Sequence, residues 1–373
     1  MRRRKFLGRF GGGALLAGAA LGAGCKADKP APADRVSAGD RAFKPVNWKM
    51  VTTWPKNFPG LGTGAIFLAD LITRMSAGRI RVKVYGAGEL VPAFEVFGAV
   101  SAGTAELGHG SAYYWKGKSE AAQFFSAVPF GLTAEEMNAW LYHGGGMQLW
   151  RETYEPFGLV PLAAGNTGVQ MAGWFNREID SLEDLQGLKM RIPGLGGEVL
   201  ARAGGTPVSL PGGELFTALQ SGAIDATEWV GPYNDLAFGL YKAARYYYYP
   251  GWHEPGTTLE CMVNKAAFDA LPEELQIIVS NAARVANQDM YAEYIARNNQ
   301  ALQTLVDEHR VELRKLPEPV LERLRELSAQ VVAEIAENDA LSKRVYDSFQ
   351  VFRQQAVPWS NISQRAYLNA RSA

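Results

Sequence analysis

The sequence contains few of the residues that form covalent or metal cross-links. Only two cysteines, Cys25 and Cys261, and four histidines occur among 373 residues. The chain has neither a Cys-x-x-Cys nor a His-x-x-x-His spacing, which are typical of zinc sites. We therefore expect no zinc site. We expect Cys261 to be a small buried apolar residue, because one leftover thiol cannot form an internal disulfide.

The sequence also has no excess of charge of one sign. Lysine plus arginine and aspartate plus glutamate number 38 each, so the formal net charge is zero. This balance gives no electrostatic reason to expect a nucleic-acid partner. Hydrophobic residues make up 47% and charged residues 20%, which predicts a packed core in a chain long enough for two domains.

The first 45 residues read as a targeting segment and a tether. Arg2 and Arg3 form a twin-arginine pair, and a mildly apolar stretch too short to span a membrane follows over 11–23. We expect residues 1–25 to be a signal peptide of the twin-arginine type, and the Pro- and Ala-rich residues 26–45 to be a tether. Cys25 follows a lipoprotein-like sequence. Two outcomes stay open: acylation of Cys25, or simple cleavage and release.

Hydrophobic periodicity after residue 45 alternates between strand and helix. The expected elements are strands over 46–53, 80–85 and 107–110, and helices over 65–76 and 94–103. This alternation predicts an α/β fold with mainly parallel sheets, in which ligands bind at the carboxyl ends of the strands. Tyr113 and Tyr114 follow such a strand end, so they are candidate wall residues of a site or ordinary interface aromatics.

Two sequences that resemble catalytic or nucleotide-binding motifs are incomplete. His143 to Gly146 is similar to an esterase oxyanion sequence, but no Gly-x-Ser-x-Gly nucleophile elbow occurs. We interpret it as a flexible break between helices. The glycine-rich turn over 60–64 lacks the Lys-Ser/Thr ending of a P-loop.

The central stretch over 188–229 contains the most informative motifs. One strand is expected to end at Arg191, shortly before Pro193, and a second short strand is followed by Glu228 and Trp229. An arginine at a strand end offers a planar fork of donors that matches a carboxylate. These two strand ends predict a small-anion site in a cleft.

These motifs resemble those of the substrate-binding proteins of tripartite ATP-independent periplasmic (TRAP) transporters. The matching sequences are K-x-R-x-P around Arg191 and G-x-I-D-A-x-E ending at Glu228. The resemblance is closer to the branch that binds 2-oxo acids and hydroxy acids with a metal ion. The segments that carry it are Thr53-Trp54-Pro55, Gly165 to Gln170, Glu228-Trp229 and Gly251-Trp252-His253-Glu254.

The resemblance implies a role for each residue of the site. Arg191 would bind the ligand carboxylate, and Trp229 and Trp252 would cover its apolar end. The substrate-binding residues would be Arg191, Gln170, Trp229, Glu254, Tyr113 and Tyr114. The metal ligands would be the side chains of Gln170, Glu228 and Glu254 and the backbone carbonyl of Trp229. These hard oxygen donors suit Na⁺ or Ca²⁺, and the choice between the two ions stays open.

The resemblance also implies an architecture and a function. The expected fold is periplasmic-binding-protein-like, with two lobes, a cleft between them and long C-terminal helices. Lobe I would comprise 46–168 and 256–296, lobe II 169–255 and 297–355, and a C-terminal tail 356–373. Such a periplasmic receptor captures a small monocarboxylate, such as pyruvate or lactate, and delivers it to a membrane permease. The long C-terminal helices would allow a homodimer. The alternatives are a periplasmic metal-dependent enzyme acting on a 2-oxo acid, or a ligand sensor.

Overall fold

The computed structural model describes residues 44–371. The expected signal peptide, most of the tether and the candidate lipidation site Cys25 lie outside the described residues. Residues 44–371 belong to one compact unit that is built on two β-sheets.

The first sheet has five strands in the order β2-β1-β3-β10-β4. Its strands are β1 (Val46–Thr52), β2 (Ile80–Tyr85), β3 (Leu107–Gly110), β4 (Leu159–Asn166) and β10 (Thr258–Asn264). β1 pairs in parallel with β2 and β3, whereas β10 runs antiparallel to β3 and β4. β10 therefore returns late in the sequence to fill the position between β3 and β4.

The second sheet has six strands in the order β11-β9-β5-β8-β6-β7. Its strands are β5 (Gly173–Phe175), β6 (Lys189–Arg191), β7 (Thr206–Val208), β8 (Ala226–Thr227), β9 (Tyr246–Tyr249) and β11 (Glu312–Lys315). β6 pairs in parallel with β7 and β8, and β5 runs antiparallel to β8 and β9. Both sheets thus contain parallel and antiparallel neighbours. The predicted α/β fold is confirmed, although its sheets are mixed and not mainly parallel.

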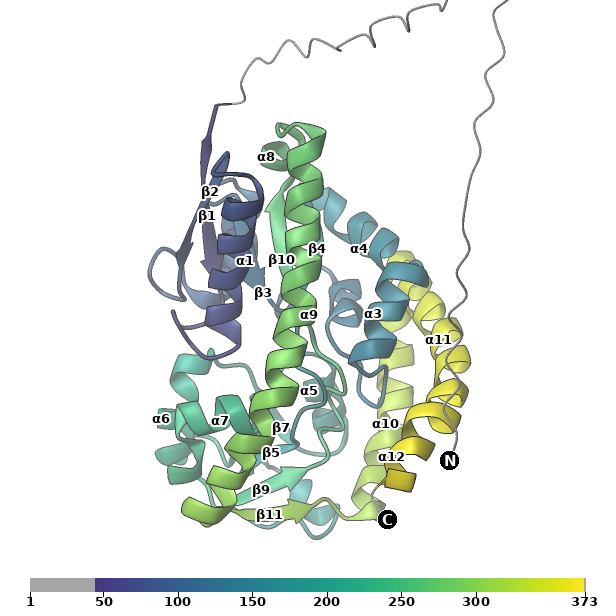
Figure 1. The fold of residues 1–373 in the computed structure, drawn as a ribbon. Coiled ribbons are helices and arrows are strands. Elements are labelled where there is room, and N and C mark those ends of the chain that lie inside the picture. The colour runs from purple at the N-terminus through teal and green to yellow at the C-terminus, as the bar shows by residue number, and fades with distance from the viewer. Residues whose placement is uncertain (1–43, 372–373) are drawn as a thin grey trace, which may run out of the picture. The chain divides into compact units, whose positions relative to one another are not determined.

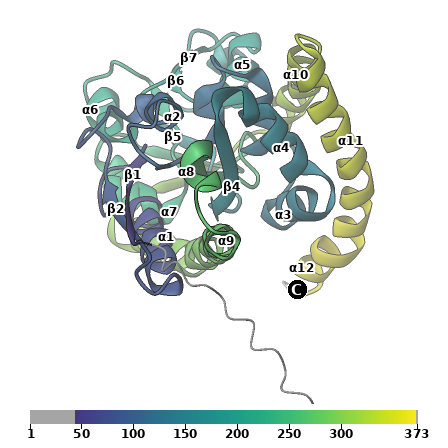
Figure 2. The same ribbon diagram turned by 90° about the horizontal axis from the view of Figure 1, so that it is seen from above.

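Twelve α-helices surround the sheets in the described part of the chain. They are α1 (Leu61–Met75), α2 (Val96–Ser101), α3 (Ala134–His143), α4 (Gly146–Tyr154), α5 (Gly194–Arg202), α6 (Leu215–Gln220), α7 (Pro232–Phe238), α8 (Lys265–Asp269), α9 (Glu273–Gln303), α10 (Glu318–Ala336), α11 (Ala340–Ser360) and α12 (Ala366–Arg371). The long helix α9 contacts α1 and β4 of the first sheet region and α7 of the second (Figures 1 and 2). It therefore links the two sheets along one side.

The predicted break between two helices lies at the end of α3. A capping box of Thr133 and Glu136 begins α3, and Gly145 begins α4 from a left-handed conformation with φ 89°. The helix break predicted at 143–146 is confirmed. The glycines let the chain turn sharply without the strain that a side chain would add.

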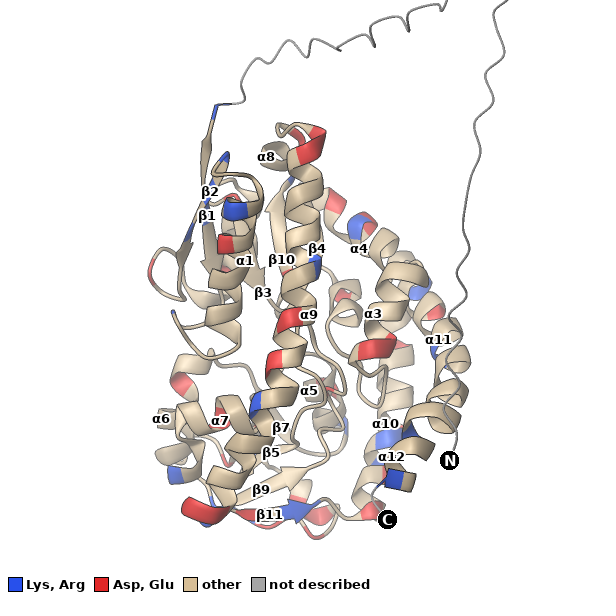
Figure 3. Cartoon of the chain, in the orientation of Figure 1, with Lys and Arg blue, Asp and Glu red and all other residues tan. Residues whose placement is uncertain are grey.

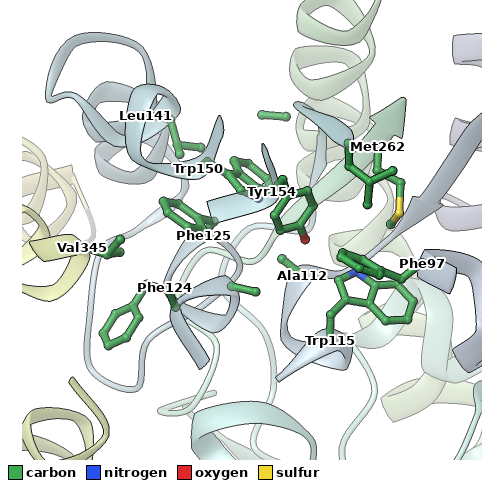
Figure 4. Packing of buried hydrophobic residues seen from close by; sticks show 14 of the residues in the cluster. Phe97, Ala112, Trp115, Phe124, Phe125, Leu141, Trp150, Tyr154, Met262 and Val345 are labelled. Carbon is green, nitrogen blue, oxygen red and sulfur yellow. The ribbon is translucent and has the colours of Figure 1, made fainter. Parts of the chain in front are cut away.

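Stacked aromatic rings fill the core beside the first sheet. The ring of Phe125 stacks on those of Trp140 and Trp150, with centroid distances of 5.6 and 5.1 Å. Figure 4 shows Phe125 beside Trp150. Phe349 of α11 packs edge-on against Trp140 at 5.3 Å. Aromatic pairs of this kind stabilise a core beyond the burial of their area. α11 is therefore anchored on the helices of the first sheet region.

The C-terminal helices continue further than the sequence pattern indicated. Pro317 precedes α10, and Asp339 caps α11 by accepting hydrogen bonds from the amides of Leu341 and Ser342 at 2.9 and 2.8 Å. Helical structure then extends through α12 to Arg371, into the residues 356–373 that were expected to form a C-terminal tail. The apolar residues of α12 are exposed, so burial did not signal this last helix in the sequence.

Charged residues are distributed without segregation. Basic and acidic side chains both occur along α9, α10 and α11 (Figure 3). Within residues 44–371, every helix is too short or too polar to cross a lipid bilayer.

Candidate functional site

Arg191 is the centre of a buried polar cluster at the end of β6. Its side chain is 1% exposed, although arginine is among the residues least often buried. Nε donates to the carbonyl of Leu210 at 3.1 Å, Nη2 donates to the hydroxyl of Tyr114 at 3.1 Å, and Nη1 donates to the carboxylate of Glu228. The guanidinium also lies 5.1 Å from the ring of Trp229. Each nitrogen of the fork thus has a partner.

The electrostatics keep Arg191 charged. Burial by itself lowers the pKa of the guanidinium, but the negative charge of Glu228 and the neighbouring tyrosines more than offset it and raise the pKa. The cation is therefore fixed in a place that bulk water does not reach.

Glu228 follows β8 directly and lies beside β6. The backbone amide of Glu228 donates to the carbonyl of Arg191 at 3.2 Å, which holds the two strand ends together. Its side chain is fully buried, and Oε1 accepts from Arg191. Oε2 has no hydrogen-bond partner within residues 44–371, and the closest basic atom is Nε2 of His253 at 3.5 Å. One oxygen of this carboxylate thus remains available.

Gln170 and Glu254 form the opposite side of the cluster. The amide nitrogen of Gln170 donates to Oε2 of Glu254 at 2.9 Å and to the hydroxyls of Thr167 and Thr257 at 3.1 Å each. Thr257 donates to the same oxygen of Glu254 at 2.5 Å. Burial, and next the charge of Glu228, raise the pKa of Glu254 to about 7.

The loop before Glu254 depends on a glycine. A Cβ at Gly251 would lie 2.2 Å from the carbonyl oxygen of Gln170, which itself accepts a hydrogen bond from the Gly251 amide at 3.0 Å. A side chain at this position would therefore separate Gln170 from Glu254.

Three buried oxygens of this cluster lack a hydrogen-bond partner in the described part of the chain. They are Oε1 of Gln170, Oε2 of Glu228 and Oε1 of Glu254. Candidate ligand atoms of Glu228, His253 and Glu254 all lie within 4.8 Å of one another. Buried polar atoms normally have partners, so unpartnered acceptors that converge fit a cation. Carboxylate and amide oxygens are the donors that Na⁺ and Ca²⁺ prefer.

The tyrosines and Trp229 complete the wall of the site. Tyr113 and Tyr114 lie in the short 3₁₀ turn Ala112–Trp115 that follows β3, and their rings meet edge to face at 4.7 Å. Tyr114 contacts Arg191 through its hydroxyl. A Cβ at Gly194 would lie 3.0 Å from that of Tyr113, so the first-sheet turn and the start of α5 approach closely.

The structure brings seven of the residues named from the sequence into one region: Arg191, Glu228, Gln170, Glu254, Tyr113, Tyr114 and Trp229. A narrow cavity of about 10 Å³ is lined by Trp54, Leu61, Tyr113, Tyr114, Thr167, Gln170, Trp229, Val230, Thr257 and Leu259. The larger hollow, about 920 Å³ between α4, α8 and α9, is an open surface groove lined by none of the predicted site residues. Size alone would therefore point to the wrong place.

One expectation stays a prediction and one residue was missed. Trp252 stacks on Phe130 at 5.9 Å in the core of the second sheet and is not among the residues that line the small cavity, so its expected cover of the ligand's apolar end stays a prediction. His253, given no role from the sequence, is 1% exposed, and both of its ring nitrogens lack a hydrogen-bond partner in the described residues. Its position next to Glu254 in the sequence was the signal that could have found it. The backbone turn at Gly251 decides which of Trp252, His253 and Glu254 faces the cluster.

Comparisons with known proteins show which proteins this chain resembles. A monocarboxylate 2-oxoacid-binding periplasmic protein of Nostoc sp. is 45% identical over 88% of this chain and 90% of its own length. A TRAP periplasmic solute-binding protein of Pseudoalteromonas atlantica, with bound sodium and pyruvate, is 43% identical. It superposes with a TM-score of 0.85 over 87% of this chain and 99% of that one.

A second solved structure carries a different cation. A TRAP periplasmic solute-binding protein of Colwellia psychrerythraea, with bound calcium and pyruvate, is 42% identical with a TM-score of 0.85, over 88% of this chain and all of that one. The profile of the DctP family, described as bacterial extracellular solute-binding protein, family 7, matches residues 50–339. The resemblance found in the motifs is confirmed, and the chain belongs to the DctP family of bacterial extracellular solute-binding proteins.

Proposed function

We propose that this chain is the extracytoplasmic receptor of a TRAP transporter and captures a small 2-oxo monocarboxylate, such as pyruvate, together with Na⁺ or Ca²⁺. A single observation carries the proposal. A buried guanidinium, Arg191, lies beside three carboxylate and amide oxygens that have no partner in the described residues. The relatives bound to pyruvate with sodium or calcium support the same ligand class.

Arg191 is the proposed anchor of the ligand carboxylate. Each hydrogen bond to a charged group stabilises binding by roughly 1.5–3 kcal/mol. Glu228 already engages Nη1, so a ligand carboxylate must share the fork with Glu228 and cannot take it alone. Tyr114 accepts a hydrogen bond from Nη2, so its hydroxyl lies beside the proposed place of the ligand carboxylate.

Gln170, Glu228 and Glu254 are the proposed side-chain ligands of the cation, with the backbone carbonyl of Trp229. A cation held by these oxygens would supply positive charge that attracts the oxygens of the ligand to the protein. If both glutamates are ionised, they balance Ca²⁺, whereas Na⁺ leaves one negative charge. His253 lies at the edge of this set, where its imidazole faces Glu228.

The functional step is capture and not catalysis. Arg191 and Glu228 belong to the second sheet, whereas Tyr113 and Tyr114 follow a strand of the first. A ligand that contacts both sides favours the closed arrangement. We therefore propose two lobes with the boundaries given above, that is, 46–168 with 256–296 and 169–255 with 297–355.

The test is calorimetric titration of pyruvate, 2-oxobutyrate and lactate into metal-stripped protein, repeated after Na⁺ or Ca²⁺ is restored. We expect binding of the 2-oxo acids only with metal. Binding that ignores the metal contradicts the bridging role. Proton NMR of pyruvate incubated with the metal-loaded protein should show no product, and product formation would establish the enzyme alternative.

Partners and location extend the proposal. We propose delivery to a membrane permease, which capture of the receptor by reconstituted TRAP membrane subunits would test against the sensor alternative. The C-terminal helical segment exposes Trp359 of α11, Ile362 of the π-helical turn Asn361–Arg365 and Tyr367 of α12 at 66%, 73% and 66%, which supports a homodimer through this segment. Sedimentation of the full chain and of a variant that ends at Ala356 tests it. Export by the twin-arginine route, with or without lipid on Cys25, stays a prediction.

A further inference from the structure

The small cavity that Gln170 lines has both polar and apolar lining residues. Gln170, Thr167 and Thr257 supply polar groups, and Trp54, Leu61, Val230 and Leu259 supply apolar surface. Its volume of about 10 Å³ is close to the least that holds one water molecule. A ligand group that enters this cavity must therefore displace lining side chains, and each added methylene must displace them further.

Trp54 is the most firmly held of the apolar lining residues. Its carbonyl accepts from the Thr52 hydroxyl at 2.9 Å and from the Ala87 amide at 2.8 Å. Its ring packs against Tyr114 at 6.3 Å and edge-on against Trp229 at 6.1 Å. Its indole nitrogen donates to Nδ1 of His109 at 2.8 Å. Both the backbone and the ring are therefore fixed.

His109 is suited to hold the indole because it accepts at Nδ1. The imidazole is fully buried, and Nε2 lies 3.4 Å from the carbonyl of Ala164, which fixes Nε2 as the protonated nitrogen. Burial lowers the pKa of His109 to about 4, so the ring is neutral near pH 7. A neutral imidazole with this tautomer offers one acceptor to Trp54.

We propose that Trp54, positioned by His109, sets the upper length of the ligand's apolar tail and restricts the receptor to 2-oxo acids with the shortest side chains. This inference rests on the proposed function. It concerns the apolar tail of the ligand, which the polar cluster does not contact. Trp54 acts as a specificity-determining residue, and His109 acts through it as a positioning residue.

The experiment is calorimetric titration of pyruvate, 2-oxobutyrate, 2-oxopentanoate and 2-oxohexanoate into the metal-loaded wild type and its variants. For the wild type, we expect affinity to fall by about tenfold or more for each methylene that does not fit. Trp54→Leu should raise the affinity for 2-oxohexanoate relative to pyruvate by at least about tenfold. If Trp54→Leu does not fold, as judged by circular dichroism, Trp54→Phe replaces it, with a smaller shift in the same direction.

Phe58→Leu is the matched control. Phe58 contacts the Trp229 ring edge-on at 6.3 Å, much as Trp54 does, but it does not line the cavity. This variant should keep the wild-type ratio of affinities within about threefold. An equal shift in both variants would mean that general loosening of the aromatic cluster, and not the Trp54 wall, sets the selectivity.

The role of His109 is separated by two substitutions. Asn at position 109 can place an acceptor oxygen near the position of Nδ1, so His109→Asn should keep the wild-type ratio. His109→Leu removes the acceptor and should shift the ratio as Trp54→Leu does. A wild-type ratio in folded His109→Leu overturns the positioning role.

The failures of the two proposals are distinguishable. A wild type that binds none of the 2-oxo acids with metal present overturns the proposed function, and the length limit with it. A wild type that binds pyruvate, with an unchanged ratio in folded Trp54→Leu or Trp54→Phe, overturns only the length limit.

Discussion

Two buried carboxylate regions of this protein have opposite hydrogen-bond states. Asp235 in α7 accepts from the indole of Trp174 at 3.0 Å, the hydroxyl of Tyr247 at 2.7 Å and the amide of Val230 at 3.4 Å, so both of its oxygens have partners. Glu228 and Glu254 are equally buried, but each has one unpartnered oxygen within the described residues. The comparison teaches that a carboxylate with all its hydrogen bonds made supports the fold. Neighbouring carboxylates that each keep an unpartnered oxygen form a place for a cation.

The largest effect is expected at Arg191, the cation beside the incompletely hydrogen-bonded carboxylates. Arg191→Ala leaves Glu228 buried without its partner, which should lower the free energy of unfolding by about 3–5 kcal/mol and abolish pyruvate binding. Urea unfolding and calorimetry measure the two effects. Arg202→Ala, which breaks an exposed pair with Glu334, should change stability by less than about 1 kcal/mol. Retained pyruvate affinity in Arg191→Ala removes this residue from the site.

The fully hydrogen-bonded carboxylate of Asp235 should make the free energy of unfolding depend on pH. Burial raises the pKa of Asp235 from 3.8 to about 7, so between these values the folded state binds more protons than the unfolded state. Stability therefore falls as pH rises from about 4 to about 7 and then levels off. This group contributes up to roughly 4 kcal/mol to the fall.

Asp235→Asn cannot titrate and should flatten this part of the curve of unfolding free energy against pH. The exposed carboxylate Asp289 of α9 provides a matched control, since Asp289→Asn should leave the slope unchanged. The same slope in wild type and Asp235→Asn would show that another group is responsible.

A smaller effect should separate the two regions by their response to metal. Ca²⁺ at about 100 times its dissociation constant should stabilise the wild type by roughly 2.7 kcal/mol. Glu254→Gln removes a proposed ligand charge and should lose most of this gain, whereas Asp235→Asn should keep it. Thermal melts with and without Ca²⁺ measure the difference. Equal loss of the Ca²⁺ stabilisation in both variants would show that the two kinds of buried carboxylate do not differ in metal binding.

Much of the fold follows from local patterns. The strands predicted at 80–85 and 107–110 coincide with β2 and β3, because alternating side chains must face a core and a covering layer. The helix predicted at 65–76 begins four residues earlier, at Leu61, because the chain turns at Gly60, which has φ 70°.

The sequence by itself determined that Arg191 ends a strand and that Glu228 follows another, because proline, glycine and apolar periodicity act over a few neighbouring residues. Only the tertiary structure decided that Gln170 and Glu254, 84 residues apart, share a hydrogen bond, that Trp252 turns away while His253 turns inward, and that Trp54 reaches the cavity. The physical reason is that desolvation and unmet hydrogen-bonding capacity depend on what surrounds an atom in three dimensions, which local sequence does not specify.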